Sequence, residues 1–112
     1  MILVEWSCKI SQDKLDDFIS FAQERLKPFY ESSGCKRYEL FFPLNTEKEF
    51  FSYQISEDKN KYAERLTFEN LRDFEELYEK IEKDQNAQDM IRKYRKDFEV
   101  KECYFKIYNK TL

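Results

Sequence analysis

The stretch Tyr62–Phe74, YAERLTFENLRDF, is typical of a β-strand that runs directly into an α-helix. Side chains alternate between the two faces of a strand, so one face carries Tyr62, Glu64, Leu66 and Phe68. The side chains between them are small or polar. From Asn70 onward, large apolar residues recur at helical spacing instead. Glu64 is therefore the one acidic group in a row of bulky side chains, and it is the first candidate for a functional residue.

The composition is that of a single globular domain spanning residues 1–112. The chain is 41% hydrophobic, 38% charged and 18% aromatic, which is enough to bury one core. Its 20 basic and 23 acidic residues are interspersed and give a net charge of −3. This pattern predicts neither a nucleic-acid-binding surface nor one for anionic membranes. The sequence also lacks a membrane-spanning apolar run and a signal-peptide pattern, so we expect a cytoplasmic protein.

The residues that usually hold metals are sparse. Histidine is absent, and the three cysteines, Cys8, Cys35 and Cys103, lie far apart in the sequence. Such cysteines are typical of reduced thiols rather than of a disulfide framework. A zinc site would need all three scattered cysteines and a carboxylate as its four ligands, which is an unusual set. The absence of histidine also removes the Ser-His and Cys-His nucleophile pairs. We therefore expect a protein with no metal and no other cofactor.

Alternation of apolar and polar residues predicts the strands. They are expected over residues 2–10, 35–42, 61–68 and 100–108. Further strand is expected between residues 44 and 60, on the strength of Phe50, Phe51, Tyr53 and Ile55.

Helical periodicity and capping residues predict the helices between these strands. The first helix is expected to begin at Ser11, to be kinked or shortened by Pro28 and to stop at Gly34. Two further helical pieces follow Asn70, with a break near Asp84. This order predicts an α+β, ferredoxin-like split βαβ fold, with an antiparallel sheet and its helices on one face.

Aromatic residues lie on both faces of several predicted strands. Adjacent strand residues point to opposite faces, and three aromatic pairs are adjacent: Phe41-Phe42, Phe50-Phe51 and Tyr104-Phe105. Helices cover one face of the sheet, so the second apolar face needs a partner. A second copy of the chain, related by a two-fold axis, is the simplest one. The sequence therefore predicts a homodimer.

Two stretches resemble the dimeric α/β-barrel proteins, the superfamily that contains the antibiotic-biosynthesis monooxygenase domains. Residues 34–40, GCKRYEL, are similar to the GC-x-x-YEL start of that superfamily's second strand. Residues 62–74 are similar to its third strand and following helix. The resemblance implies two ferredoxin-like protomers whose sheets join into a barrel, with a cavity inside the barrel or between sheet and helices. Some members oxidise aromatic polyketides without a metal or flavin, and others degrade haem.

The sequence departs from these members at three points. Phe68 stands where a tryptophan usually ends the third strand of the monooxygenase members. Trp6 replaces an asparagine that is common in the first strand of the active members. The haem-degrading members use a histidine ligand that this chain lacks. The resemblance therefore supports the fold and the dimer more than either chemistry.

The site predicted from these observations is centred on Glu64 as the catalytic residue. We expect the Tyr62–Phe68 row to face away from the helices, because Ala63 and Thr67 are small enough for helices to lie close above them. The predicted substrate-binding residues around this carboxyl group are Trp6, Tyr38, Tyr62, Leu66 and Phe68. A carboxyl group in apolar surroundings has a raised pKa, which would make it a usable base near neutral pH.

Two functions follow from this site. The first is a barrel that binds a small apolar or aromatic molecule and carries out cofactor-independent, oxygenase-like chemistry on it. The alternative is a non-catalytic homodimeric module for ligand sensing or assembly. In that case Glu64 would be structural and pair with Arg37, Arg65 or a residue of the second protomer.

Overall fold

The structure is a computed structural model that describes residues 1–44 and 60–112. The further strand expected around Phe50 and Tyr53 lies outside the described residues. The strands are β1 (Ile2–Lys9), β2 (Arg37–Phe41), β3 (Lys61–Phe68) and β4 (Lys101–Asn109). The helical segments are η1 (Gln12–Lys14), α1 (Leu15–Phe21), η2 (Ala22–Leu26), α2 (Lys27–Ser32), α3 (Leu71–Lys83) and α4 (Gln85–Asp97).

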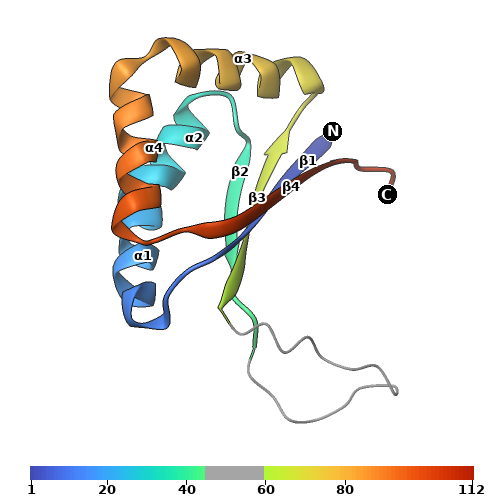
Figure 1. Cartoon of the computed structure of the whole chain (residues 1–112). Helices are drawn as coiled ribbons and strands as arrows, with labels where there is room; N and C mark the ends of the chain where they lie inside the picture. The colour runs from blue at the N-terminus through green and yellow to red at the C-terminus, as the bar shows by residue number, and fades with distance from the viewer. Residues whose placement is uncertain (45–59) are drawn as a thin grey trace, which may run out of the picture.

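The described strands form one antiparallel sheet in the order β2-β3-β1-β4. The helices lie together on one side of this sheet, so the molecule has two layers (Figure 1). Strand order, antiparallel pairing and helix placement confirm the predicted α+β ferredoxin-like fold. β3 and β1 are the two central strands, so side chains on their helix-facing side lie at the middle of the core.

The first helix contains a π-helical segment, η2, which ends two residues before Pro28. Proline has no N–H to donate, and its ring crowds the carbonyl group four residues earlier. A π-helical turn widens the helix where that carbonyl lies, which is a common way to accommodate such a disturbance. The helical run as a whole extends from Gln12 to Ser32, close to the predicted range.

The residues at the helix ends behave as predicted, with one exception. Gly34 has φ = 101°, a left-handed conformation that ends the first helix. The side chain of Asn70 accepts a hydrogen bond of 2.9 Å from the Asp73 backbone N–H and so caps α3. Asp84 separates α3 from α4 and caps α4. The exception is Ser11, whose hydroxyl makes no capping hydrogen bond to the helix backbone.

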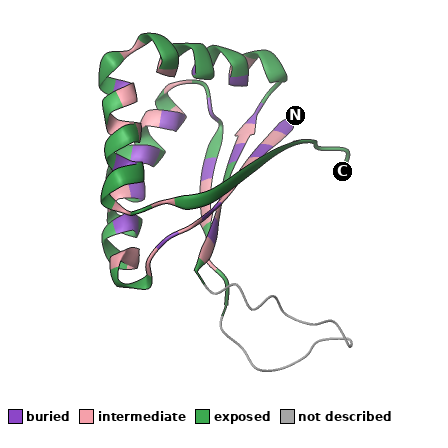
Figure 2. Ribbon diagram, in the orientation of Figure 1, coloured by how far each residue is buried: buried purple, intermediate pink, exposed green. Residues whose placement is uncertain are grey.

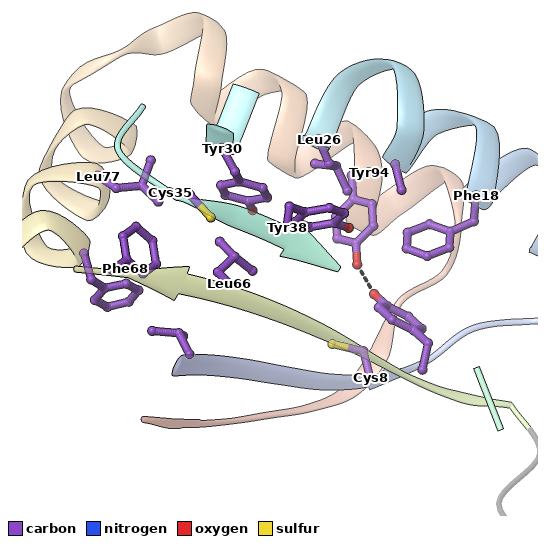
Figure 3. Close-up of a cluster of buried hydrophobic side chains, with 14 of the residues drawn as sticks. Cys8, Phe18, Leu26, Tyr30, Cys35, Tyr38, Leu66, Phe68, Leu77 and Tyr94 are labelled. Atoms are coloured by element: carbon purple, nitrogen blue, oxygen red, sulfur yellow. Dashed lines mark hydrogen bonds between the residues drawn. The ribbon is translucent and has the colours of Figure 1, made fainter. Parts of the chain in front are cut away.

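The Tyr62–Phe68 row faces the helices, so the prediction that it faces away from them is wrong. Leu66 and Phe68 are completely buried, and the Tyr62 ring lies 4.7 Å from the ring of Phe18 in α1. Figure 3 shows Leu26, Tyr30 and Phe18 reaching from the helices toward this side of the sheet. The physical reason is that protein interiors are closely packed, so large side chains must fill the space between the helix layer and the sheet. Small side chains at that position would leave cavities.

The opposite, helix-free face of β3 carries the small and charged residues. Arg65 Nε lies 2.8 Å from Glu5 Oε2, and its guanidinium carbon lies 4.8 Å from the centre of the Phe41 ring. All residues of β4 are exposed, so this edge strand stands out in Figure 2. Tyr104 is 64% exposed and Tyr108 is 42% exposed on the helix-free face.

Among the helices of residues 1–44 and 60–112, none has the length and apolar character that a membrane span requires.

Candidate functional site

A cavity of about 850 Å³ lies between the sheet and the helices α3 and α4 and is partly open to solvent. Its volume is within the usual range for small-molecule sites, which is about 300–1,000 Å³. The sheet side of the wall is formed by residues of β1, β3 and β4: Trp6, Cys8, Glu64, Cys103 and Phe105. The helix side includes Tyr30, Phe74, Leu77, Ile81, Ile91, Tyr94 and Arg95. The cavity therefore occupies the helix-covered face of the sheet.

Glu64 is the one buried charged side chain among the described residues, and two tyrosines hold its carboxyl group. The Tyr38 hydroxyl donates to Glu64 Oε2 at 2.7 Å, and the Tyr94 hydroxyl donates to Oε1 at 3.1 Å. The Tyr62 hydroxyl contacts that of Tyr94 in turn. The predicted pairing of Glu64 with Arg37 or Arg65 is wrong for this chain. The carboxyl group is held by neutral donors.

The environment of Glu64 shifts its acid–base equilibrium. Burial raises the pKa of Glu64 from 4.5 to about 7. The hydrogen bond from Tyr38 acts in the opposite direction and lowers the pKa, but its effect is the smaller one. Near neutral pH, this carboxyl group therefore exists in both protonation states. Burial and the nearby Glu64 charge also raise the pKa of Tyr38, so its hydroxyl remains a donor. Glu64 can accordingly accept or release a proton under ordinary conditions, as a general acid or base must.

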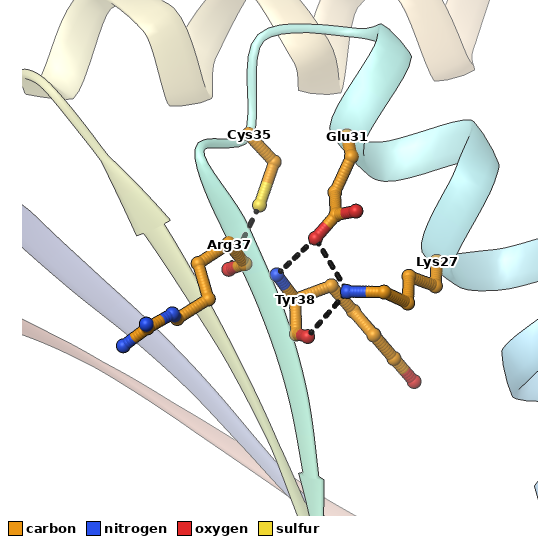
Figure 4. A network of polar contacts seen from close by, with 5 residues as sticks. All are labelled: Lys27, Glu31, Cys35, Arg37 and Tyr38. Carbon is orange, nitrogen blue, oxygen red and sulfur yellow. Dashed lines mark hydrogen bonds and ion pairs between the residues drawn. The ribbon is translucent and has the colours of Figure 1, made fainter.

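Tyr38 is positioned by a polar network at the end of α2 (Figure 4). Its backbone N–H donates to Glu31 Oε2 at 3.0 Å, and Lys27 Nζ lies 2.7 Å from the same oxygen. Its ring stacks on that of Tyr30 with 5.6 Å between the ring centres. The hydrogen bond holds the Tyr38 backbone, and the stacking on Tyr30 holds its ring. The hydroxyl group is thereby directed at Glu64.

Aromatic rings form much of the cavity wall beside the carboxyl group. Trp6 is the direct cross-strand neighbour of Glu64. The Trp6 ring lies 6.1 Å from Phe105, nearly parallel to it, and 6.1 Å from Phe74. A planar apolar molecule entering the cavity would contact these rings. Glu64 would then be the polar group that fixes its orientation.

The outer wall of the cavity carries charges of both signs. Arg92 and Arg95 come from α4, while Glu75, Glu79 and Glu82 come from α3. The Arg95 charge also affects a buried tyrosine. Burial and the Glu64 charge raise the pKa of the Tyr30 hydroxyl, and the Arg95 charge lowers it in part. The mixed rim gives the cavity no strong preference for one sign of net charge.

The predicted site residues divide into two groups. Trp6 and Glu64 line the cavity. Tyr38, Tyr62, Leu66 and Phe68 are buried in the core behind that wall. Tyr38 touches Glu64 directly and Tyr62 reaches it through Tyr94, whereas Leu66 and Phe68 contribute packing.

Sequence reasoning missed the contribution of α4 and β4 to the site. Tyr94 lies in the apolar stripe of α4 and could be recognised in the sequence only as a core residue. Its hydroxyl nevertheless bonds to Glu64. Phe105 and Cys103 come from a strand whose pairing partner is not evident from the sequence. Within residues 1–44 and 60–112, no group of three or more histidine, cysteine or acidic residues is arranged to hold a metal ion.

Comparison of the sequence with protein-family models and with curated proteins returned no match. Solved structures, in contrast, share the fold over nearly the whole chain. A dimeric ferredoxin-like protein from an uncultured marine organism is 13% identical, with a TM-score of 0.68 over 100% of this chain and 96% of that chain. An antibiotic biosynthesis monooxygenase is 9% identical, with a TM-score of 0.65 over 100% of both chains.

A third similar structure is a point mutant of SnoaB, a cofactor-independent oxygenase from Streptomyces nogalater. It is 11% identical, with a TM-score of 0.66 over 99% of this chain and 93% of that chain. These likenesses confirm that the chain has the fold of the antibiotic-biosynthesis monooxygenase-like and dimeric ferredoxin-like proteins. At such low identity they establish the fold alone, since one fold serves many chemistries.

Proposed function

We propose that this protein binds a small, largely aromatic molecule in the cavity and that Glu64 takes a proton from it. The observation that carries the proposal is a carboxyl group with a pKa of about 7 in the wall of a cavity of about 850 Å³. Titratable groups with strongly shifted pKa values are concentrated at functional sites. Trp6 and Phe105 would contact the apolar part of the molecule. Tyr38 and Tyr94 hold Glu64 in place.

The chemistry that suits this arrangement is removal of a proton from a weakly acidic O–H or C–H group. A substrate carbanion formed next to a ketone or phenol can itself reduce molecular oxygen. In that reaction a CH₂ group and O₂ become a C=O group and water, so the substrate supplies all the electrons and no cofactor is needed. The proton taken by Glu64 returns to the departing hydroxide as water forms. The similar fold of a cofactor-independent oxygenase supports this reaction as the oxygenase form of the proposal.

The alternative function is a non-catalytic module that senses a ligand. One observation favours it: both Glu64 oxygens already accept hydrogen bonds from tyrosines. In this case the ligand would bind to the apolar wall, and the carboxyl group would serve only to organise the core. The two functions differ in whether Glu64 exchanges a proton with the ligand.

The test is titration with 4-nitrophenol, a coloured aromatic weak acid. Trp6 is the one tryptophan of the chain and lies in the wall, so binding should quench its fluorescence saturably. The absorbance of the phenol reports its own protonation state. In Glu64→Gln, we expect binding to weaken roughly tenfold near neutral pH, where the carboxylate would accept the phenol O–H. Well above neutral pH the phenol is itself an anion, so binding to the wild type should fall as the two negative charges repel. The control Glu24→Gln changes the same kind of group on the exposed surface of η2, away from the cavity and the helix-free face, and should bind normally.

The outcomes separate the proposals. Saturable binding that is identical in the wild type and Glu64→Gln at every pH would favour the sensing module. No saturable quenching of Trp6 by 4-nitrophenol would count against this class of ligand. Turnover of a substrate in air by the wild type, lost in Glu64→Gln, would establish the oxygenase form.

We also propose that the protein is an obligate homodimer joined through the helix-free face of the sheet. Phe41, Tyr104 and Tyr108 are exposed on that face. A protein of the same fold is dimeric. A standard interface buries roughly 1,600 Å² and would cover this surface. Sedimentation equilibrium at micromolar concentration should give a dimer for the wild type and for Leu71→Glu on exposed α3, but not for Tyr104→Glu. A folded wild-type monomer would contradict the proposal.

A further inference from the structure

Two cysteines that are 95 positions apart in the sequence lie side by side at the edge of the sheet. β1 and β4 pair antiparallel, with Ser7 opposite Tyr104 and Lys9 opposite Lys101. One residue of β1, Cys8, therefore stands opposite two residues of β4, Glu102 and Cys103. This is a β-bulge, and the left-handed conformation of Glu102, with φ = 51°, belongs to it.

The bulge brings the two thiols into contact. The side chains of Cys8 and Cys103 lie close enough for Cys103 to raise the pKa of the Cys8 thiol, and both line the cavity. Cys8 is buried, whereas Cys103 is exposed. Nearest cross-strand residues of an antiparallel pair have Cα atoms about 4.5–5.5 Å apart, and a disulfide needs about 4.4–6.8 Å. The backbone at the bulge can thus accept a disulfide without large movement.

We propose that Cys8 and Cys103 are a redox-active pair that forms a reversible disulfide when the protein meets a hydroperoxide. The Cys103 sulfur first attacks the peroxide O–O bond and becomes a sulfenic acid, and the peroxide leaves as water or an alcohol. The Cys8 sulfur then attacks the sulfenic sulfur, the S–S bond forms, and the hydroxyl group leaves as water with the Cys8 proton. Two thiols and one hydroperoxide give one disulfide and two small products, so the electrons balance.

The order of these steps follows from the surroundings of the two thiols. Burial, followed by the contact with Cys103, raises the pKa of the Cys8 thiol, so it is a poor first nucleophile. Cys103 is accessible to a dissolved peroxide. Cys8 lies beside it, held on a central strand, and needs no diffusion to react with the sulfenic acid.

The third cysteine provides a matched comparison. Cys35 is buried beside α2, where its thiol donates to the Arg37 carbonyl oxygen at 3.2 Å. It lies next to β2, at the other edge of the sheet from β4. It should therefore stay reduced while the Cys8–Cys103 pair is oxidised.

The disulfide would act on the cavity wall. Phe105, two residues after Cys103, stacks on Trp6, two residues before Cys8. Joining Cys8 to Cys103 would fix the exposed strand β4 to the central strand β1 beside these rings. This inference does not depend on the identity of a ligand or on the role proposed for Glu64.

The experiment treats the reduced, full-length protein with hydrogen peroxide and maps its thiols. Two of the three cysteines should become unreactive to a thiol reagent under denaturing conditions, and the mass should fall by about 2 Da as two hydrogens leave. Trypsin should release the segment Met1–Lys9 linked to the segment Glu102–Lys106. Dithiothreitol should restore all the thiols. Cys35→Ser should still form the link, and Cys103→Ser should not.

The same map can overturn the proposal. Peptides Met1–Lys9 and Glu102–Lys106 that stay unlinked while Cys103 gains oxygen atoms would show that Cys8 does not react with the sulfenic acid. A link from Cys103 to Cys35, or only to a second molecule, would show that the contact across the bulge does not direct the reaction. Because Cys103 is exposed, Cys103→Ser should fold even if a substitution at Cys8 does not.

Discussion

Replacing Glu64 by glutamine should change how the stability of the protein depends on pH. Glutamine has nearly the same shape as glutamate and no charge at any pH. Its amide group can still bond to the two hydroxyls that hold the carboxyl group, those of Tyr38 at 2.7 Å and Tyr94 at 3.1 Å. The substitution therefore removes one titration and leaves the packing intact.

The size and sign of the effect follow from the shifted pKa. Burial raises the pKa of Glu64 from 4.5 to about 7 in the folded protein. Between these pH values the folded state binds more protons than the unfolded state, so stability falls as the pH rises. The contribution is fully present below pH 4.5 and is lost as the pH passes through about 7. At 1.36 kcal/mol per pH unit, the loss is about 3 kcal/mol.

The assay is urea-induced unfolding of both proteins, followed by circular dichroism from about pH 4 to about pH 8 at one protein concentration. Relative to Glu64→Gln, the wild type should lose about 3 kcal/mol of unfolding free energy over this range. The control Glu24→Gln, at an exposed position of η2, should follow the wild type. Parallel pH dependences for the wild type and Glu64→Gln would refute the reasoning, because they would mean that folding leaves the pKa of Glu64 unchanged.

Three further substitutions test the elements around the site. Tyr38→Phe removes a hydrogen bond that lowers the pKa of Glu64, so the pH at which binding or stability changes should move upward, as a pH titration would show. Gly34→Ala places a side chain where φ is 101°, and chemical unfolding should show a loss of roughly 1 kcal/mol from backbone strain. Asn70→Ala removes the cap of α3 and should cost about 1 kcal/mol in the same measurement, with no change in the pH dependence of stability.

The sequence predicted the ends of several elements because those ends depend on neighbouring residues. The strand Lys61–Phe68 has the predicted bounds. Gly34, Asn70 and Asp84 end or begin helices as expected, since a left-handed φ or a capping side chain acts within a few residues. Strands β2 and β4 differ slightly from their predicted ranges, because sheet pairing decides where a strand ends.

The error about the orientation of β3 has a different origin. Alternation divides its residues into two sets, but it does not say which set meets the helices. Small residues at Ala63 and Thr67 suggested close helix packing on that side. The structure places Leu66 and Phe68 there instead, completely buried. The volume between the sheet and the helices decides which set of β3 side chains faces the helices, and that volume is a property of the assembled layers.

The sequence by itself determined the fold class, the bounds of β3, and the choice of Glu64 in that strand as the candidate functional residue. Each of these depends on local spacing and on side-chain type. Tertiary structure alone decided what surrounds the carboxyl group: Tyr94 comes from α4, Trp6 from β1, and both reach Glu64 because sheet pairing and helix packing bring them together. The pairing of β1 with β4 likewise places Cys8 beside Cys103. Such contacts depend on the register between distant segments, which no short stretch of sequence encodes.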